Sequence, residues 1–542
     1  MKFKTLSVCL LLANLVTAQN VNVKLRSQLK YSGQELANIC GYTDPETGKE
    51  YALVGTSKGA SIVDISNPDS PKEVKFITGP TSEWREIKVK GDYAYVTTEG
   101  GGGLQIINMK SLPDASGIVY KSWTGGSAGS LTSIHALHID GNFVYLYGSK
   151  LFNGGALVAD ISDPYNPVYV GNYQATGGGK RPYVHDGFVK NDTLYACHIY
   201  EGFTDIVDFR DKKNPKVLGS IETPGKFSHN SWLNENSKVM FTTDEVSNSF
   251  LTAYDISDPA NITEIDRIQS NPGSKSIVHN THIIKIGDGQ FAVTSWYRDG
   301  FTIVDVTRPN NMVQVGNYDT YAGSGSGFNG DWGVFPFFPS KTIVVSNIED
   351  GLFVFTPTYV RACYLEGTVT DSITNLPIQG ATVQVTIANL TETTNITGNY
   401  ATGMPAPGGT YTVTYSATGY IPKTLNNVVL SSGNLTVKNV KLLSKSFNGI
   451  DENELERVKV NAYPNPFTNE LTISYDLQNK LLAGSSIVIS DVLGRKMDEI
   501  KIDQAKGTIA LKPDIHAGIY FIRIVNGAES SQPVKIMKQE NN

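Results

Sequence analysis

The 542-residue chain contains little cysteine and little net charge, and it has no long apolar run after its first residues. It has four cysteines, one of which, Cys9, lies in the N-terminal apolar segment, so an odd three remain and no disulfide framework is indicated. A net charge of −6 without any lysine or arginine cluster argues against a nucleic-acid partner. No run beyond residue 18 approaches the ~20 apolar residues of a membrane helix, so we expect no transmembrane helix in the mature chain.

Short catalytic motifs are missing as well. We find no nucleophile elbow, zincin helix or P-loop, and therefore assign no catalytic residue.

The chain instead repeats one segment seven times. GASIVDISNP, residues 59–68, returns in altered form at intervals of 44 to 52 residues. The polar residues that end the apolar run of each copy are Asp64, Asn108, Asp160, Asp208, Asp255, Asp305 and Thr356. A fixed period of this length is typical of repeat architectures. Each copy holds about four strand-like segments, and one such sheet cannot bury both of its faces alone, so we predict that the copies close into an all-β, seven-bladed β-propeller.

The first and last copies of the repeat resemble a known family. The block LANICGYTDPETGKEYALVGTSKGASIVDIS from Leu36 and the last copy, FNGDWGVFPFFPSKTIVVSNIEDGLFVF from Phe328, resemble the choice-of-anchor B family, whose copies are also called LVIVD repeats. The resemblance covers roughly residues 36–357 and implies a propeller. That family has no determined molecular function, so the resemblance implies no reaction.

The segments around the repeat predict further domains. Residues 1–18, with Lys2 and Lys4 before an apolar run, predict a secretory signal peptide. We assign residues 19–359 to the propeller. Residues 360–443 read as a small β-sandwich, and the motif GTVTD, residues 367–371, with the segment PIQGATV, residues 377–383, resembles a carboxypeptidase regulatory-like (transthyretin-like) domain. This resemblance implies a non-catalytic module.

A polar linker, residues 444–459, precedes the last segment, residues 460–542, which we expect to be a second small sandwich. Its motifs YPNPF, IVISDVLGRK, GIYFIR and VKIMK resemble, in this order, the type A C-terminal sorting domain of type IX secretion. The resemblance implies that type IX machinery carries the chain across the outer membrane of a Bacteroidetes-type bacterium and that the domain is then removed. It also implies an extracellular or outer-membrane surface location, with the product released or attached to surface lipopolysaccharide.

One position of the repeat carries a possible site. In the strand that opens each copy, the same register holds Asn38, Arg85, His135, His185, His229, His279 and Asp331. The turn between the second and third strands places a charged residue directly before its glycine in five copies: Lys58, Glu99, Glu201, Asp299 and Asp350. Both sets lie at the same end of a blade, so we expect them to ring one mouth of the axial channel. The four histidines with Glu99, Glu201, Asp299 and Asp350 could bind a divalent cation, the only cofactor that the sequence indicates, or a cationic ligand.

A structural alternative stays open for these histidines. Each could hydrogen-bond the backbone of the adjacent blade and so satisfy polar groups buried between sheets. His138, His198 and His282 lie off this register, and we interpret them as structural. We give His516, in the C-terminal segment, no role. A disulfide between Cys40 and Cys363, which flank the ends of the ring, also stays open.

Two functional hypotheses follow. The first is a secreted, surface-displayed propeller that acts as a binding module for a glycan, a protein or a small ligand. The alternative is a metal-dependent propeller hydrolase or lyase that uses the axial ring of histidines and acids.

Overall fold

The computed structural model describes residues 20–175, 183–323, 325–386, 390–445, 458–477, 484–526 and 529–540. The expected signal peptide, residues 1–18, lies outside these ranges. The chain divides into two compact units, Met1–Arg361 and Ala362–Asn542.

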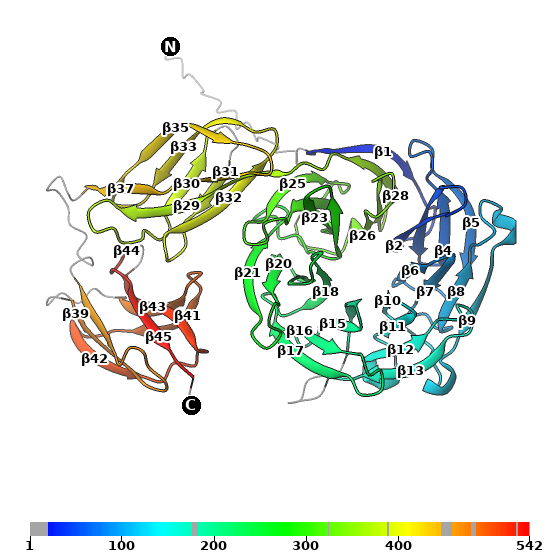
Figure 1. The fold of residues 1–542 in the computed structure, drawn as a ribbon, viewed down its shortest axis with the longest axis horizontal. Coiled ribbons are helices and arrows are strands. Elements are labelled where there is room, and N and C mark those ends of the chain that lie inside the picture. Colours follow the sequence, from blue (N-terminus) through cyan, green and yellow to red (C-terminus); the bar gives the residue numbers. More distant parts are fainter. Residues whose placement is uncertain are drawn as a thin grey trace, which may run out of the picture. The chain divides into compact units, whose positions relative to one another are not determined.

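Seven four-stranded antiparallel sheets make up the described part of the first unit, and they are arranged around a central axis (Figure 1). We number them as sheets 1 to 7 in the order of their innermost strands. The innermost strands are β2 (Leu36–Thr43), β6 (Ile87–Lys90), β10 (Ala136–Asp140), β14 (Asp186–Lys190), β18 (Ser228–Leu233), β22 (Thr281–Ile286) and β26 (Asp331–Phe335). The innermost strand of each sheet contacts that of the next, and β26 contacts β2, so the ring is closed.

The other strands follow outward from the axis. The second strands are β3 (Glu50–Thr56), β7 (Tyr93–Val96), β11 (Phe143–Tyr147), β15 (Thr193–His198), β19 (Val239–Asp244), β23 (Gly289–Ser295) and β27 (Ile343–Asn347). The third strands are β4 (Gly59–Asp64), β8 (Leu104–Asn108), β12 (Ala156–Asp160), β16 (Phe203–Asp208), β20 (Leu251–Asp255), β24 (Phe301–Asp305) and β28 (Gly351–Pro357). The outermost strands are β5 (Lys72–Thr78), β9 (Val119–Trp123), β13 (Val168–Tyr173), β17 (Lys216–Glu222), β21 (Thr263–Ile268), β25 (Val313–Tyr318) and β1 (Val23–Leu29). Three short 3-10 helices, η1 (Ala115–Gly117), η2 (Gly126–Ala128) and η3 (Leu151–Gly154), lie in connections.

Sheet 7 is assembled from both ends of the unit. Its order is β1-β28-β27-β26, so the last copy supplies three strands and the N-terminal segment supplies the fourth. The register runs from Val23 opposite Pro357 to Leu29 opposite Leu352. This pairing ties the beginning of the propeller to its end.

The core lies between adjacent sheets. One cluster joins Leu53 and Ile62 of sheet 1 to Ile87 and Val96 of sheet 2, and similar clusters join the following sheets up to sheet 6, as well as sheets 7 and 1. Between sheets 6 and 7 the Phe301 and Phe355 rings pack with centroids 5.1 Å apart. Each sheet therefore buries both faces against its neighbours, as expected for a propeller.

The repeated aspartate forms a turn. Asp64 Oδ1 accepts a hydrogen bond of 2.9 Å from the Ser66 backbone N–H, and Asp160 Oδ1 accepts one of 2.7 Å from Ser162 N–H. The sequence interpretation of this residue as turn chemistry matches these contacts.

The second unit holds two further pairs of sheets with separate cores. The strands of the first pair are β29 (Ala362–Asp371), β30 (Thr382–Val385), β31 (Leu390–Thr393), β32 (Asn399–Pro405), β33 (Gly409–Ser416), β34 (Tyr420–Ile421), β35 (Lys423–Leu430), β36 (Leu435–Val437) and β37 (Val440–Ser444). The strands of the second pair are β38 (Lys459–Tyr463), β39 (Leu471–Asp476), β40 (Ser486–Asp491), β41 (Lys496–Lys501), β42 (Lys506–Leu511), β43 (Gly518–Asn526), β44 (Glu529–Ser530) and β45 (Val534–Lys538).

The structure bears on the disulfide and on the transmembrane helix considered from the sequence. Cys40, Cys197 and Cys363 are buried and unpaired, and Cys40 packs in the core between sheets 1 and 2 while Cys363 packs in the first core of the second unit. A disulfide between Cys40 and Cys363 is therefore wrong. Among the described residues, no helix is long and apolar enough to span a membrane.

Candidate metal centre

Six of the seven register residues meet at one end of the axis. Asn38, Arg85, His135, His185, His229 and His279 line a cavity of about 20 Å³. That volume accommodates one water-sized occupant.

Asp331 departs from the predicted ring. The pairing of β26 shifts between Asp331 and Gly333, and the neighbouring Trp332 lines the cavity instead. The Asp331 carboxylate accepts a hydrogen bond from the Thr320 hydroxyl, away from the histidines.

Backbone pairing holds the histidines at the axial end of their strands. His135 N–H donates to Tyr147 O over 2.9 Å and His185 N–H donates to Cys197 O over 2.8 Å, which fixes each residue to the second strand of its own sheet. A threonine of the preceding sheet bonds to the carbonyl of two of the histidines. Thr97 Oγ1 donates to His135 O over 3.0 Å, and Thr243 Oγ1 donates to His279 O over 2.6 Å.

The four imidazoles form a row. Ring centroids are 4.0 Å apart between His135 and His185, 4.6 Å between His185 and His229, and 4.2 Å between His229 and His279. Burial, together with the neighbouring imidazoles, lowers the pKa of His185 and His229 well below the usual value, and burial lowers the pKa of His279 to about 3. The three rings are therefore neutral at physiological pH, which is the form that binds metals.

An acid that the sequence analysis missed completes the row. Glu245 directly follows β19, and its carboxylate oxygens lie 3.9 Å from His229 Nε2 and 3.7 Å from His279 Nε2. The Tyr297 hydroxyl donates a hydrogen bond of 2.7 Å to Glu245 Oε1, from a backbone conformation with φ of 40°. Burial raises the pKa of Glu245 to about 7, although the Tyr297 hydrogen bond acts in the opposite direction.

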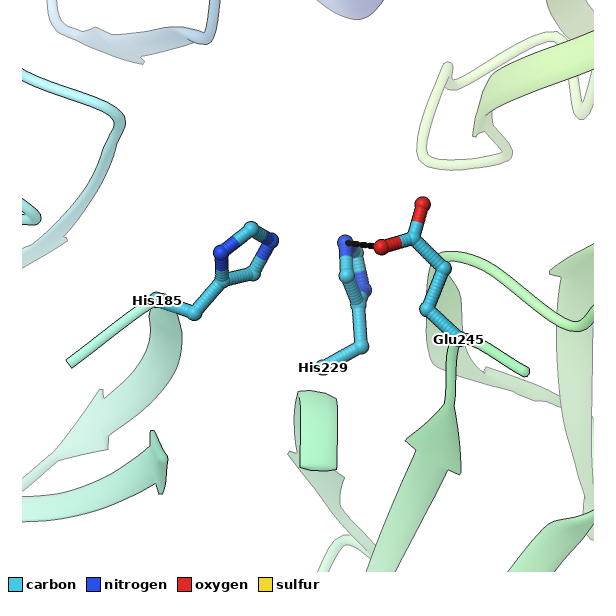
Figure 2. A group of neighbouring side chains, drawn as sticks. All are labelled: His185, His229 and Glu245. Carbon is cyan, nitrogen blue, oxygen red and sulfur yellow. Dashed lines mark ion pairs between the residues drawn. The ribbon is translucent and has the colours of Figure 1, made fainter. Parts of the chain in front are cut away.

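Figure 2 shows His229 between His185 and Glu245, with an ion pair between His229 and the Glu245 carboxylate. One ligand atom from each residue lies within 4.8 Å of the other two. Zinc with tetrahedral ligands at ~2.0–2.1 Å holds those ligands roughly 3.3 Å apart, so small side-chain movements suffice to close the group around an ion. His135 Nε2 and His185 Nε2 already lie 3.1 Å apart.

The two outer histidines have their second nitrogen engaged. His135 Nδ1 lies 2.6 Å from Glu99 Oε1, and His279 Nδ1 donates to Trp332 O over 2.5 Å. An N–H held by such an acceptor leaves the lone pair on Nε2, which here faces the other imidazoles or Glu245. Carboxylate and carbonyl partners of this kind orient the histidine ligands of metal sites.

The remaining predicted residues have other roles. Asn38 donates its amide to the Glu86 carboxylate, and the Arg85 guanidinium donates to Thr56 O and Pro80 O. The structural alternative holds for His279, whose Nδ1 bonds to the backbone carbonyl of Trp332 in the adjacent sheet. Asp299 accepts hydrogen bonds of 2.6 and 2.7 Å from the Ser270 and Ser274 hydroxyls.

Among the predicted acids, Glu99 contacts a histidine of the row, His135. Glu201 and Asp350, like Asp299, are not among the residues that line the cavity or form the ligand group. His198 is structural: its Nδ1 donates to Tyr183 O over 3.0 Å, and its Nε2 lies 3.4 Å from Asp205 Oδ2.

A sequence signal for Glu245 exists. Glu99 and Glu245 each follow by two residues the threonine that bonds to the histidine carbonyl of the next sheet. The segments Thr97-Thr98-Glu99 and Thr243-Asp244-Glu245 are therefore equivalent. The fifth copy lacks the glycine that marks this turn in other copies, so the glycine pattern does not identify Glu245.

One exposed aromatic side chain lines this cavity, and two others pack on tyrosines that contact His185 and His279. Trp84, Tyr200 and Phe328 are 40%, 58% and 58% exposed. Trp84 lines the cavity, Tyr200 packs on Tyr183 at 5.1 Å, and Phe328 packs on Tyr297 at 5.4 Å. We call these three residues the aromatic rim.

Family models match three parts of the chain. The LVIVD repeat model matches residues 49–78, 83–111, 134–175 and 289–320. The carboxypeptidase regulatory-like domain model matches residues 364–443, and the secretion system C-terminal sorting domain model matches residues 461–539. The chain therefore carries LVIVD repeats in its propeller and both C-terminal domains that the sequence indicated. The sorting domain supports interaction with the secretion machinery and implies export to the extracellular or outer-membrane surface.

Other comparisons add little. None of the curated proteins compared with the chain matches it. Among solved structures, the chain is similar to the β-propeller domain of Cps50 (Swd1) from Myceliophteria thermophila, with 9% identity, 61% of this chain and 99% of that chain covered, and a TM-score of 0.45.

Proposed function

We propose that this exported LVIVD-repeat propeller binds one divalent transition-metal cation at its axial cluster and acts at the cell surface as a metal-dependent binding protein. The observation that carries the proposal is the orientation of the outer imidazoles. His135 and His279 both direct Nε2 toward the cluster because Glu99 and the Trp332 carbonyl engage Nδ1. His185, His229 and Glu245 supply the inner ligands.

The ligand chemistry restricts the metal. Calcium and magnesium prefer oxygen ligands, whereas imidazole nitrogens suit zinc, copper, nickel and cobalt. Glu245 is the single carboxylate in the ligand group, so a nitrogen-rich set favours the second class.

The aromatic rim supports a binding role. A cation held by the three protein ligands His185, His229 and Glu245 keeps a fourth position for an oxygen or nitrogen of a bound molecule. Trp84, Tyr200 and Phe328 offer apolar surface beside that position. We infer that the bound molecule combines a metal-binding group with an apolar face.

The sequence resemblances supply the rest of the proposal. We infer that the chain is a choice-of-anchor B protein with domains 19–359, 360–443 and 460–542, and that after loss of the sorting domain it is released or attached to lipopolysaccharide. Intact-mass analysis of the exported protein tests the processing. Retention of residues 460–542 in that product would refute it.

Metal analysis tests the central proposal. Protein purified without chelator should contain about one equivalent of a transition metal, and His229→Ala and His135→Ala should lower that content at least tenfold. His282→Phe is the matched control, because it removes another buried histidine of the propeller and should retain the metal. Absence of metal from the wild-type chain, together with no binding of added zinc, copper, nickel or cobalt, would overturn the proposal.

A second candidate is a metal-dependent hydrolase or lyase. The His135–Glu99 pair favours it, because an imidazole oriented by a carboxylate is suited to general base catalysis when His185, His229 and Glu245 alone hold the cation. In this candidate His135→Ala keeps the metal and loses turnover. Turnover of an ester, lactone or glycan panel that is lost with chelator and in His135→Ala would support this candidate. Inactivity of the metal-loaded chain on the whole panel would leave binding as the function.

A further inference from the structure

A second cavity, of about 360 Å³, lies further along the same inner strands. Its walls include Lys88, His138, Trp232 and His282, which follow Arg85, His135, His229 and His279 by three residues each. Three residues of extended strand span ~10 Å, so this cavity is separate from the metal centre. His138 and His282, which the sequence analysis interprets as structural, thus share one position of the repeat and line one cavity.

Aromatic rings form much of the wall. The Trp232 ring lies 5.7 Å from Phe337, 4.8 Å from His282 and 5.8 Å from His138, measured between centroids. Phe335 packs on Phe337 at 5.4 Å and also lines the cavity. Phe337 is 37% exposed, so the cavity opens to solvent. These flat apolar faces suit a ring-shaped ligand.

The charge in the wall is compensated. Lys88 is the only charged residue among those that line the cavity, and its ammonium pairs with the Glu86 carboxylate. Burial lowers the pKa of His138 to about 3 and that of His282 well below its usual value, so both imidazoles are neutral. With no carboxylate in the wall and the single cation already paired, the cavity favours a neutral ligand over an ionic one.

One polar atom in the wall has no partner. His282 is 7% exposed, and its Nδ1 makes no hydrogen bond among the described residues. A buried polar atom left unpaired costs about 1–3 kcal/mol. Because this atom is screened from solvent, a ligand hydroxyl bonds to it only after the imidazole turns toward the cavity, whereas a purely apolar ligand would leave it unpaired.

We propose that this cavity binds a neutral polyhydroxylated ring, namely a pyranose unit of a glycan. The C–H face of the sugar packs on Trp232 and Phe337, and its hydroxyls bond to His282 and His138. The volume lies within the ~300–1,000 Å³ typical of small-molecule sites. This site goes beyond the metal-dependent function proposed above, because none of the metal-ligand candidates lines it.

Binding of free monosaccharides to the full chain in the presence of EDTA tests this site independently of the metal. Calorimetry and tryptophan fluorescence with glucose, galactose, mannose, xylose and N-acetylglucosamine should show saturable binding of at least one sugar, with a Kd of about 1 mM. His282→Phe keeps an aromatic ring but removes the hydrogen bond, and it should weaken that binding at least tenfold. Trp232→Ala should abolish it. Tyr120→Ala, which removes an exposed aromatic side chain from the outermost strand β9, should bind like the wild type.

Three outcomes would overturn the proposal. These are no binding of any sugar in the panel, unchanged binding by His282→Phe, and tighter binding of indole than of every sugar. If both cavity variants fail to melt cooperatively, a crystal of the wild-type chain soaked with the best sugar decides. Sugar density against Trp232 supports the proposal, and density only elsewhere refutes it.

Discussion

At the scale of single residues, the axial cluster depends on one buried acid, Glu245. It is the carboxylate nearest to two of the four imidazoles, and Tyr297 holds it in place. Burial raises its pKa to about 7, and the Tyr297 hydrogen bond and the charge interaction with His135 offset only part of that rise. A bound cation would lower the pKa further.

Glu245→Gln should therefore weaken zinc binding by about 10- to 100-fold while leaving the fold intact, because the amide keeps the shape of the side chain but removes its charge. Calorimetric titration of chelator-treated protein with zinc measures the effect. Glu201→Gln is the matched control, since Glu201 is absent from the ligand group. Equal zinc affinity in the two variants would contradict the assignment of Glu245.

The same residues make stability depend on pH. Burial holds the pKa of His185, His229 and His279 far below the value of about 6.5 in an unfolded chain. Their contribution to the free energy of unfolding is complete above about pH 6.5. It is lost as the pH falls below that value, at up to about 1.4 kcal/mol per pH unit for each histidine. Glu245 acts in the opposite direction: its pKa is raised to about 7, so its contribution is complete near pH 4.5 and is lost as the pH rises to 7.

On acidification, the stability lost through the three histidines exceeds the stability gained through Glu245. Metal-free protein should therefore lose stability between pH 6.5 and 5. Urea midpoints of the wild type and of His229→Asn at several pH values measure this loss, and effects of distant carboxylates cancel in the comparison. The variant should lose less stability on acidification. Parallel curves for the two proteins would show that His229 is not held neutral in the fold.

How far sequence can predict this site depends on the residue. The register of His135, His185, His229 and His279 is visible because a repeat places equivalent residues at a fixed period. Glu245 and the exclusion of Asp331 are not visible in the same way. They depend on a turn without glycine and on a strand irregularity between Asp331 and Gly333, which the period does not encode.

At the scale of elements, the ring depends on how sheet 7 closes. The repeat predicts seven copies, but the last copy is clipped and holds only three strands. The fourth strand is β1, whose sequence VKLRSQL does not repeat the pattern of the copies. β1 pairs with a strand more than 320 residues away, and this pairing is determined by tertiary structure. The local sequence pattern therefore could not identify β1 as the fourth strand of sheet 7.

Deletion of residues 20–30 should destabilise the whole propeller, because it removes β1, leaves the edge of β28 unpaired and opens the ring. We expect a loss of several kcal/mol, seen as a clear fall in melting temperature or as aggregation. Thermal melts followed by circular dichroism measure it. A deletion variant that melts cooperatively at the wild-type temperature would show that β1 does not close the ring.

At the scale of the whole molecule, the sorting domain and the proposed metal centre lie in separate segments. The sorting domain matches at residues 461–539, whereas the axial cluster lies entirely within the propeller. The two compact units of the chain agree with this separation.

Removal of residues 460–542 should therefore leave a folded propeller that no longer reaches the surface or the medium. Cell fractionation of the truncated and full-length chains measures location, and zinc binding by the purified truncated chain confirms the fold. Surface or medium levels equal to those of the full-length chain would contradict a sorting role for this domain.

The most direct test of the account is anomalous diffraction from crystals of this protein grown with zinc. We predict one strong anomalous peak on the propeller axis, at ~2.0–2.1 Å from an imidazole nitrogen of His185 and of His229 and from a carboxylate oxygen of Glu245. An axial cluster without a peak, or peaks confined to exposed surface residues, would contradict the proposed metal centre.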